Sequence, residues 1–141
     1  MTLHFAYGSN MWEAQMRQRC PQSEKIGRAR LRGYRWIIST AGYANVVESK
    51  GHQVEGVLFE LSPSDEKSLD RYEGVAAGAY RKNVLPVRQS GRTVKALVYI
   101  APEIQEGVPR KEYIKRINAG LADAKLSRAY IEGQVRKFIP A

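Results

Sequence analysis

The chain has 141 residues, of which 43% are hydrophobic and 26% charged, with one cysteine and a formal net charge of +9. This length is that of one ordinary domain and suffices to bury a core, so we expect a single domain over residues 1–141. No apolar run approaches the roughly 20 residues of a membrane-spanning helix, and the N-terminus lacks a secretory leader pattern, so a cytoplasmic protein is expected. The lone cysteine excludes an intrachain disulfide, and no spacing typical of metal ligands is present.

The positive charge attracts anions in general and does not by itself define a partner. Salt-sensitive contact with nucleic acid is one interpretation. We favour the other, a basic surface on an enzyme whose anionic small substrate benefits from the field. We therefore expect a small-molecule partner, no specific nucleic acid and no membrane.

The first part of the chain predicts a strand, a glycine turn and a helix. Residues 2–6 predict a strand, which the sequence YGSN at positions 7–10 ends. Asn10 followed by Glu13 resembles a capping box, so we expect a helix to begin there and to stop before Pro21.

Strands dominate the next part. Residues 28–39 alternate between arginine and apolar side chains at their start, which is typical of a strand. Two further strands, at 44–49 and 54–61, flank the sequence KGH at positions 50–52. That sequence predicts a hairpin turn.

A helix after these strands has signals at both ends. Ser62 can cap it, Pro63 suits its first position, and Gly74 is a natural C-terminal residue. We expect Leu69 and Tyr72 to face inward.

A hairpin and two helices complete the prediction. Residues 80–88 and 93–100 predict strands joined by a Gln-Ser-Gly-Arg turn. Apolar residues spaced four apart from Tyr113 onward indicate an amphipathic helix, and Ser127 can cap a last one. The pattern predicts an α+β fold with a mostly antiparallel sheet, without separating a rolled sheet from a barrel. The apolar face of the last helices leaves a homodimer open.

Two segments carry candidate chemistry, and the first is the YGSN turn. A strand runs there into a glycine and a helix start, so the backbone N–H groups lack partners of their own. Such groups can receive a carboxylate or a carbonyl oxygen that is gaining charge. Gly8 lets the backbone approach a ligand closely. A simple connection between strand and helix is the alternative.

The second segment contains Glu73, at the last turn of its helix, where a carboxylate opposes the helix dipole and has its pKa raised. A solvated surface acid is the alternative. Other candidates are weaker, since nothing indicates a histidine partner for Cys20 and Ser9 lacks a GxSxG setting. The arginines within 28–32 predict a solvated strand face, with attraction of a substrate carboxylate as the alternative.

The segments FAYGSNM and SLDRYEGVAAGAYRKNVLPV resemble signature regions of the γ-glutamyl cyclotransferases, the AIG2-like group. ARLRGYRW, NVVESKG, ALVYI and the P-x-x-x-Y run that begins at Pro109 keep the family's order, so the resemblance covers residues 2–127. It implies a small mixed, mostly antiparallel β-barrel with surrounding helices. It also implies a reaction without metal or organic cofactor, in which an L-γ-glutamyl amine or amino acid closes to 5-oxoproline and releases its amine.

The resemblance extends to individual residues. Glu73 resembles the acid–base glutamate, and Tyr113 resembles a tyrosine that reaches the substrate from a late helix. The substrate-contacting loop and its approach strand correspond to His4, Phe5, Ala6, Tyr7, Gly8 and Ser9. Further pocket-wall positions correspond to Asn10, Tyr80 and Tyr99. Some members have a tyrosine at the position of His4, so only a backbone role carries over there.

The chemistry of the residues agrees with this resemblance. The substrate's α-ammonium must lose a proton before its nitrogen can attack the γ-carbonyl, and the leaving amine must gain one. A single carboxylate can do both in sequence. The ordinary glutamate pKa of about 4.3 would have to rise towards ~6–7, which burial near Tyr72 or Tyr80 would achieve.

We therefore predict a γ-glutamyl cyclotransferase with Glu73 as its proton shuttle. Two alternatives stay open. The first keeps the chemistry but changes the substrate to a γ-glutamyl-protected metabolite or γ-glutamyl-ε-lysine. The second is a non-catalytic basic module that binds an anionic partner.

Overall fold

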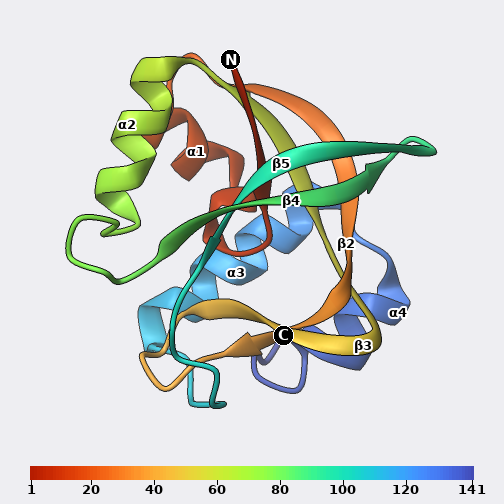
Figure 1. Ribbon diagram of the computed structural model, residues 1–141. Helices are drawn as coiled ribbons and strands as arrows, with labels where there is room; N and C mark the ends of the chain where they lie inside the picture. The colour runs from red at the N-terminus through yellow and green to blue at the C-terminus, as the bar shows by residue number, and fades with distance from the viewer.

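The computed structural model describes residues 1–141, which form a closed barrel of strands with helices packed around it (Figure 1). The strands are β1 (Thr2–Ala6), β2 (Glu24–Ile38), β3 (Ala44–Leu61), β4 (Arg81–Gln89) and β5 (Arg92–Ile100). They follow one another around the barrel in the order β1-β3-β2-β4-β5, and the parallel pair of β1 and β5 closes it. All other pairs are antiparallel. The predicted small, mixed, mostly antiparallel barrel is confirmed.

Strand β3 is one long strand, so the predicted hairpin turn within it is wrong. It pairs with β2 along both of its halves, and the register shifts between Arg32 and Tyr34 of β2. Opposite this shift, residues 49–52 leave the pairing and Gly51 has a φ of 84°. A glycine with positive φ serves a bulge as readily as a turn, so the local sequence did not distinguish them. Strand β2 also begins earlier than predicted, at Glu24.

The predicted hairpin of β4 and β5 is present. Its tight turn places Ser90 and Gly91 at φ values of 50° and 76°, the left-handed pair that suits the twist of two antiparallel strands. The other edge of β5 meets β1, where Leu97 pairs with His4. The closure therefore brings β5 beside the strand that leads into the YGSN segment.

Helix α1 (Glu13–Arg19) begins after a 3-10 turn at Ser9–Met11, and no side chain caps it. The N–H of Glu13 instead donates to the Asp123 carboxylate, at 2.8 Å. The predicted capping box is wrong because the Asn10 side chain is taken up by partners from other parts of the chain.

Helix α2 (Pro63–Tyr72) has the ends that the sequence predicts. The Ser62 hydroxyl accepts the N–H of the residue three positions on, at 3.1 Å, and Gly74 ends the helix with a φ of 63°. Leu69 is fully buried, as predicted. Tyr72 is 55% exposed, so its predicted inward orientation is wrong. The buried residues of α2 are Asp65 and Leu69, and the next position at this spacing of four is Glu73.

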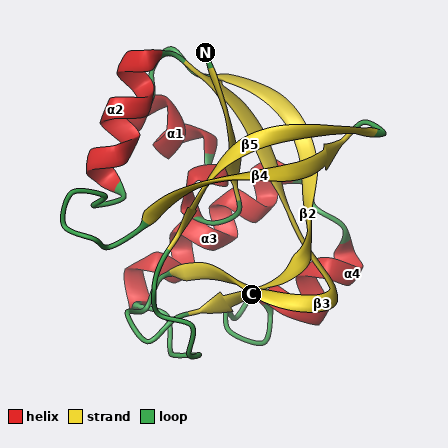
Figure 2. Cartoon of the chain, viewed as in Figure 1, coloured by secondary structure: helices red, strands yellow, loops and turns green.

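The C-terminal helices also follow the prediction. Helix α3 (Lys111–Ala124) buries the apolar stripe that begins at Tyr113, and Ser127 caps helix α4 (Arg128–Tyr130). A π-helical turn at Ile131–Val135 continues α4. Figure 2 shows α1 and α2 together on one side of the barrel and α4 on the other. No helix combines the length and apolar character that a membrane crossing requires.

Strand β1 passes very close to β3, and one glycine permits it. A Cβ on Gly56 would overlap the carbonyl oxygen of Ala6 and would lie 2.8 Å from Cζ of Phe5. Only glycine leaves room for this approach. Because Ala6 directly precedes the YGSN segment, the same contact fixes where that segment leaves the barrel.

We expect Gly56→Ala to lower the free energy of unfolding by about 1–3 kcal/mol, because the added methyl overpacks the contact between β1 and β3. Urea denaturation measures this change. Gly133→Ala is the matched control, since a Cβ there meets nothing within 4 Å, and it should be neutral or stabilising. Unchanged stability of Gly56→Ala would contradict the close approach.

Candidate active site

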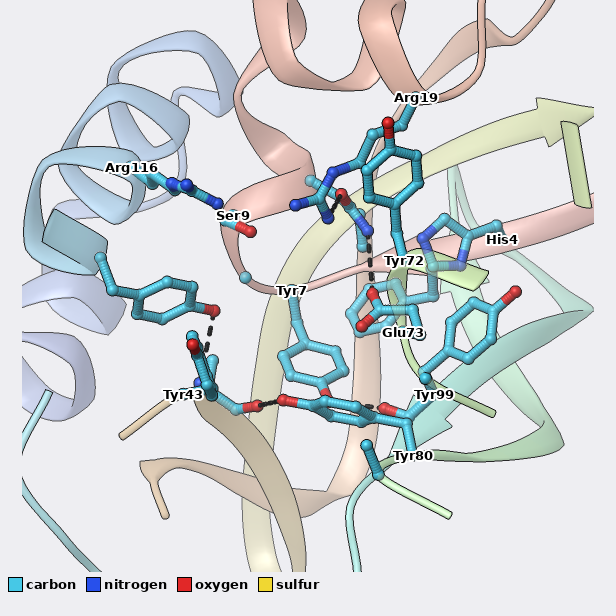
Figure 3. A pocket seen from close by; sticks show the side chains of 18 of the residues that line it. His4, Tyr7, Ser9, Arg19, Tyr43, Tyr72, Glu73, Tyr80, Tyr99 and Arg116 are labelled. Carbon is cyan, nitrogen blue, oxygen red and sulfur yellow. Dashed lines mark hydrogen bonds between the residues drawn. The ribbon is translucent and has the colours of Figure 1, made fainter. Parts of the chain in front are cut away.

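A cavity of about 360 Å³ opens beside the end of β1 and is framed by α1, α2 and α3 (Figure 3). All the residues predicted for the site line it, namely His4, Phe5, Ala6, Tyr7, Gly8, Ser9, Asn10, Glu73, Tyr80, Tyr99 and Tyr113. These residues lie together around one cavity, whereas their individual roles stay predictions. The carboxylate of Glu73 points into this cavity from the end of α2 (Figure 3).

The Glu73 carboxylate is enclosed by protein and has an unusual acidity. Burial raises its pKa from 4.5 to about 7, although the nearby Arg19 charge and a hydrogen bond from Asn10 both act to lower it. The carboxyl therefore exchanges its proton near neutral pH. A group in this state can accept a proton and return it, which is the property required of a general acid–base.

Asn10 connects Glu73 to the rest of the site. Its amide nitrogen donates to Glu73 Oε1 at 3.1 Å. Its Oδ1 accepts from Gln15 and Arg19, each at 3.1 Å, and Gln15 also donates to the Ser9 hydroxyl at 2.9 Å. All of these polar groups are buried or partly buried, so the network fixes the carboxylate in one orientation.

The turn before Asn10 lines the cavity and contains backbone donors without a protein partner. The backbone N–H groups of Tyr7 and Gly8 donate to no protein acceptor, while the Tyr7 carbonyl is held by the indole N–H of Trp36 at 2.8 Å. A Cβ on Gly8 would lie 3.0 Å from the Tyr113 hydroxyl and 3.2 Å from Ala44 Cβ. The turn is thus packed tightly on one side and open to a ligand on the other.

Four of the tyrosines that line the cavity are those predicted for the site, and three of these four use their hydroxyl protons within the protein. Tyr7 donates to the Tyr99 carbonyl at 2.5 Å, Tyr80 to the Ala44 carbonyl at 2.7 Å, and Tyr99 to a carboxylate of α2 at 2.7 Å. The Tyr113 oxygen instead accepts the Ala44 N–H at 3.3 Å. Burial raises the pKa of all four, that of Tyr113 to about 12, so their hydroxyls stay neutral.

His4 is anchored by its side chain as well as by its backbone. Its Nδ1–H donates to the Leu97 carbonyl at 3.2 Å, and its ring meets that of Tyr99 edge-on at 5.4 Å. Burial lowers the pKa of His4 to about 4, so the ring is neutral. It therefore adds no positive charge to the cavity wall.

Comparison with known protein families agrees with the geometry of the cavity. The model of the family described as gamma-glutamyl cyclotransferase, AIG2-like, matches residues 4–118. The chain belongs to the AIG2-like gamma-glutamyl cyclotransferase family. The predicted resemblance is confirmed, and the protein is an enzyme of the gamma-glutamylcyclotransferase type.

Individual members of this family are similar over nearly the whole chain. The gamma-glutamylcyclotransferases of Homo sapiens and Bos taurus are 28% and 29% identical to it, covering 92% and 91% of this chain and 75% and 74% of their own. A solved structure named gamma-glutamyl cyclotransferase superposes with a TM-score of 0.88 at 26% identity. It covers 99% of this chain and 89% of its own.

Sequence reasoning missed the charged part of the cavity wall. Arg19 and Arg116 line it, as do Tyr43 and Tyr72. Arg116 lies three residues after Tyr113 and therefore on the same face of α3, a spacing that could have identified it. The arginines of residues 28–32, the alternative considered above, do not line the cavity.

The structure also bears on Cys20 and on metal-ligating side chains. Cys20 does not line the cavity, and its pKa is raised to about 12, chiefly by burial, so it is no thiolate nucleophile. No group of three or more histidine, cysteine, aspartate or glutamate side chains is arranged to hold a metal ion.

We expect Glu73→Gln to be more stable than the parent protein, by an amount that depends on pH. The folded pKa of about 7 lies above the ordinary value of 4.5, so between these values the folded state binds more protons than the unfolded state. Wild-type stability should then fall relative to Glu73→Gln by up to about 1.4 kcal/mol per pH unit, and the difference should level off above the folded pKa.

Urea unfolding of both proteins at a series of pH values from 4 to 8 measures this difference. The substitution keeps an oxygen for the Asn10 hydrogen bond, so the comparison isolates the charge. A stability difference that does not vary across this range would contradict the burial of an ionisable carboxyl at position 73.

Proposed function

We propose that the protein releases an amine or amino acid from an L-γ-glutamyl substrate by intramolecular ring closure, with 5-oxoproline as the second product and Glu73 as the proton shuttle. The supporting observation is the Glu73 carboxylate in the cavity, with its pKa raised to about 7. Tyr7 and Gly8, whose N–H groups have no protein acceptor, line the same cavity. The identity of the substrate and of the products is a proposal that rests on this chemistry and on membership in the family.

The first step makes the substrate nucleophilic. The Glu73 carboxylate accepts a proton from the substrate's α-ammonium, and the freed nitrogen lone pair attacks the γ-carbonyl carbon. A carbon–nitrogen bond forms, the carbonyl π electrons move onto oxygen, and a five-membered tetrahedral intermediate results. Because both reacting groups belong to one molecule, a bent bound conformation supplies part of the ~7–11 kcal/mol that good orientation offers.

The developing oxyanion needs donors that are already in place. The N–H groups of Tyr7 and Gly8 are not used by the protein, and the Tyr113 hydroxyl, which accepts the Ala44 N–H, retains its own proton. One such donor is typically worth ~2.7–4 kcal/mol of transition-state stabilisation. The turn is therefore the part of the chain that we assign to the oxyanion.

The second step returns the proton. Neutral Glu73 donates it to the nitrogen of the scissile amide, the bond between that nitrogen and the γ-carbon breaks, and the carbonyl re-forms as the ring amide. The ring nitrogen, which entered the intermediate with two protons, passes one through Glu73 to the departing amine. The amine therefore leaves as an ammonium, and Glu73 is again a carboxylate. Substrate and products have the same atoms, so no water or co-reactant is consumed.

Glu73→Gln should lower kcat/KM by about 10²–10⁴-fold, because the amide cannot exchange a proton, while the fold is retained. Incubation with a panel of γ-glutamyl amino acids and amines, with 5-oxoproline detected by mass spectrometry, measures turnover. In the wild type, kcat/KM should rise with pH up to about 7, where the base form of Glu73 becomes dominant, and then flatten. Near-normal activity of Glu73→Gln would show that another group carries the proton.

Gly8→Val should reduce kcat/KM by about 10²-fold with a smaller effect on folding. The added side chain would press on the Tyr113 hydroxyl and on Ala44, and it would displace the donors of the turn. Gly133→Val controls for the general effect of valine, because its site is open. If Gly8→Val melts far below Gly133→Val but keeps its activity per folded molecule, the turn is only a structural connector.

A further inference from the structure

Three neighbouring strands of the barrel carry positive side chains and almost no negative ones. Strands β4 and β5 contain no aspartate or glutamate, and β2 contains none after Glu24. On β2 the arginines alternate with the buried Ala29 and Leu31, so they face away from the core. The outward-facing bases of the three strands form what we call the basic strip: Arg28, Arg30, Arg32, Arg88 and Lys95.

The basic strip lies apart from the catalytic cavity. Figure 1 shows β2 and the tip of the hairpin of β4 and β5 on the side of the barrel away from α1 and α2. None of the five residues lines the catalytic cavity or the cavity beside it. The charge of the strip therefore does not serve to hold the small substrate.

The side chains of the strip are exposed and have no acidic partner. None of them takes part in the ion pairs of the protein. Arg28 donates to the Lys125 carbonyl at 3.1 Å, and Arg88 donates to the Thr93 hydroxyl at 3.2 Å. Lys125 is itself an exposed base, so it extends the strip at one end.

Two arginines of the strip lie directly opposite each other. Arg30 of β2 pairs with Arg88 of β4, and like charges in this position destabilise a sheet. The acid on the other side of Arg30 is Glu55 of β3, but its carboxylate already accepts the N–H and the hydroxyl of Ser127, at 2.8 Å and 2.6 Å. An anion bound between Arg30 and Arg88 would relieve their repulsion.

The spacing of the strip indicates the kind of anion. Arg28, Arg30 and Arg32 follow one another at every second position of a strand, which places them about 7 Å apart in a line. A guanidinium binds phosphate through two parallel hydrogen bonds. A line of such groups suits a chain of regularly spaced phosphates. The strip contains no aromatic side chain on which a base could stack, so its contacts would be with the backbone of that chain.

We propose that the basic strip binds the phosphate backbone of a single nucleic acid strand without reading its sequence. This surface is separate from the catalytic cavity, and the inference does not depend on the proposed reaction. It agrees with the expectation that no specific nucleic acid is a partner, and it gives the arginines of residues 28–32 a role that the substrate does not supply.

Fluorescence anisotropy with a labelled oligouridine of about 16 nucleotides tests the proposal, at salt concentrations from about 50 to 200 mM. Four arginines that each neutralise one phosphate should give a plot of log K against log salt with a slope of about −3. Arg30→Gln/Arg88→Gln should halve this slope and weaken binding about tenfold or more at the lowest salt. Arg32→Gln, which loses no hydrogen bond within the protein, should reduce the slope by about 0.7.

Arg17→Gln/Arg71→Gln is the matched control. It removes the same charge from exposed positions of α1 and α2 that have no acidic partner and line neither cavity. It should leave the slope unchanged, and circular dichroism checks that each variant is folded. Equal losses in the two double variants would overturn the proposal, because net charge rather than the strip would then hold the RNA.

Two other polyanions separate phosphate recognition from general attraction. Polyglutamate of matched charge should bind at least about tenfold more weakly than oligouridine, because its carboxylates lack the phosphate geometry and spacing. Vesicles containing phosphatidylserine should not compete with the RNA. Polyglutamate binding as tight as that of RNA, or binding to vesicles alone, would overturn the assignment to a nucleic acid backbone.

Discussion

The hydrogen bond between Asn10 and Glu73 joins two parts of the chain that are 63 residues apart, the turn after β1 and the end of α2. Burial raises the pKa of the Glu73 carboxyl. The Arg19 charge and the Asn10 donor oppose burial, and the net pKa is about 7. The site therefore depends on a balance between an apolar enclosure and a small number of polar contacts, in which each component shifts the acidity of one group.

The barrel supplies the rigidity that this balance needs. Strand β1 lies between β3 and β5, so both of its edges are paired. The close contact at Gly56 leaves no room for the end of β1 to move toward β3. The aromatic wall is fixed in the same way, since Tyr7 and Tyr80 donate to backbone carbonyls rather than to mobile side chains. Hydrogen bonds to backbone place these rings without flexible intermediates, so little rearrangement is needed when charge develops on a bound substrate.

The parts of the structure that sequence predicted are those set by local physics. The Ser62 cap and the stripe that begins at Tyr113 depend only on nearby residues, and both are present. The failures have tertiary causes: Gly51 serves a bulge because β2 continues past it, and Asn10 does not cap α1 because Glu73 and Arg19 engage its side chain. For the site, the turn and the glutamate carried recognisable motifs. Arg19 and Arg116 of the cavity wall did not, since an arginine on a helix surface has the same local pattern whether it faces water or a cavity.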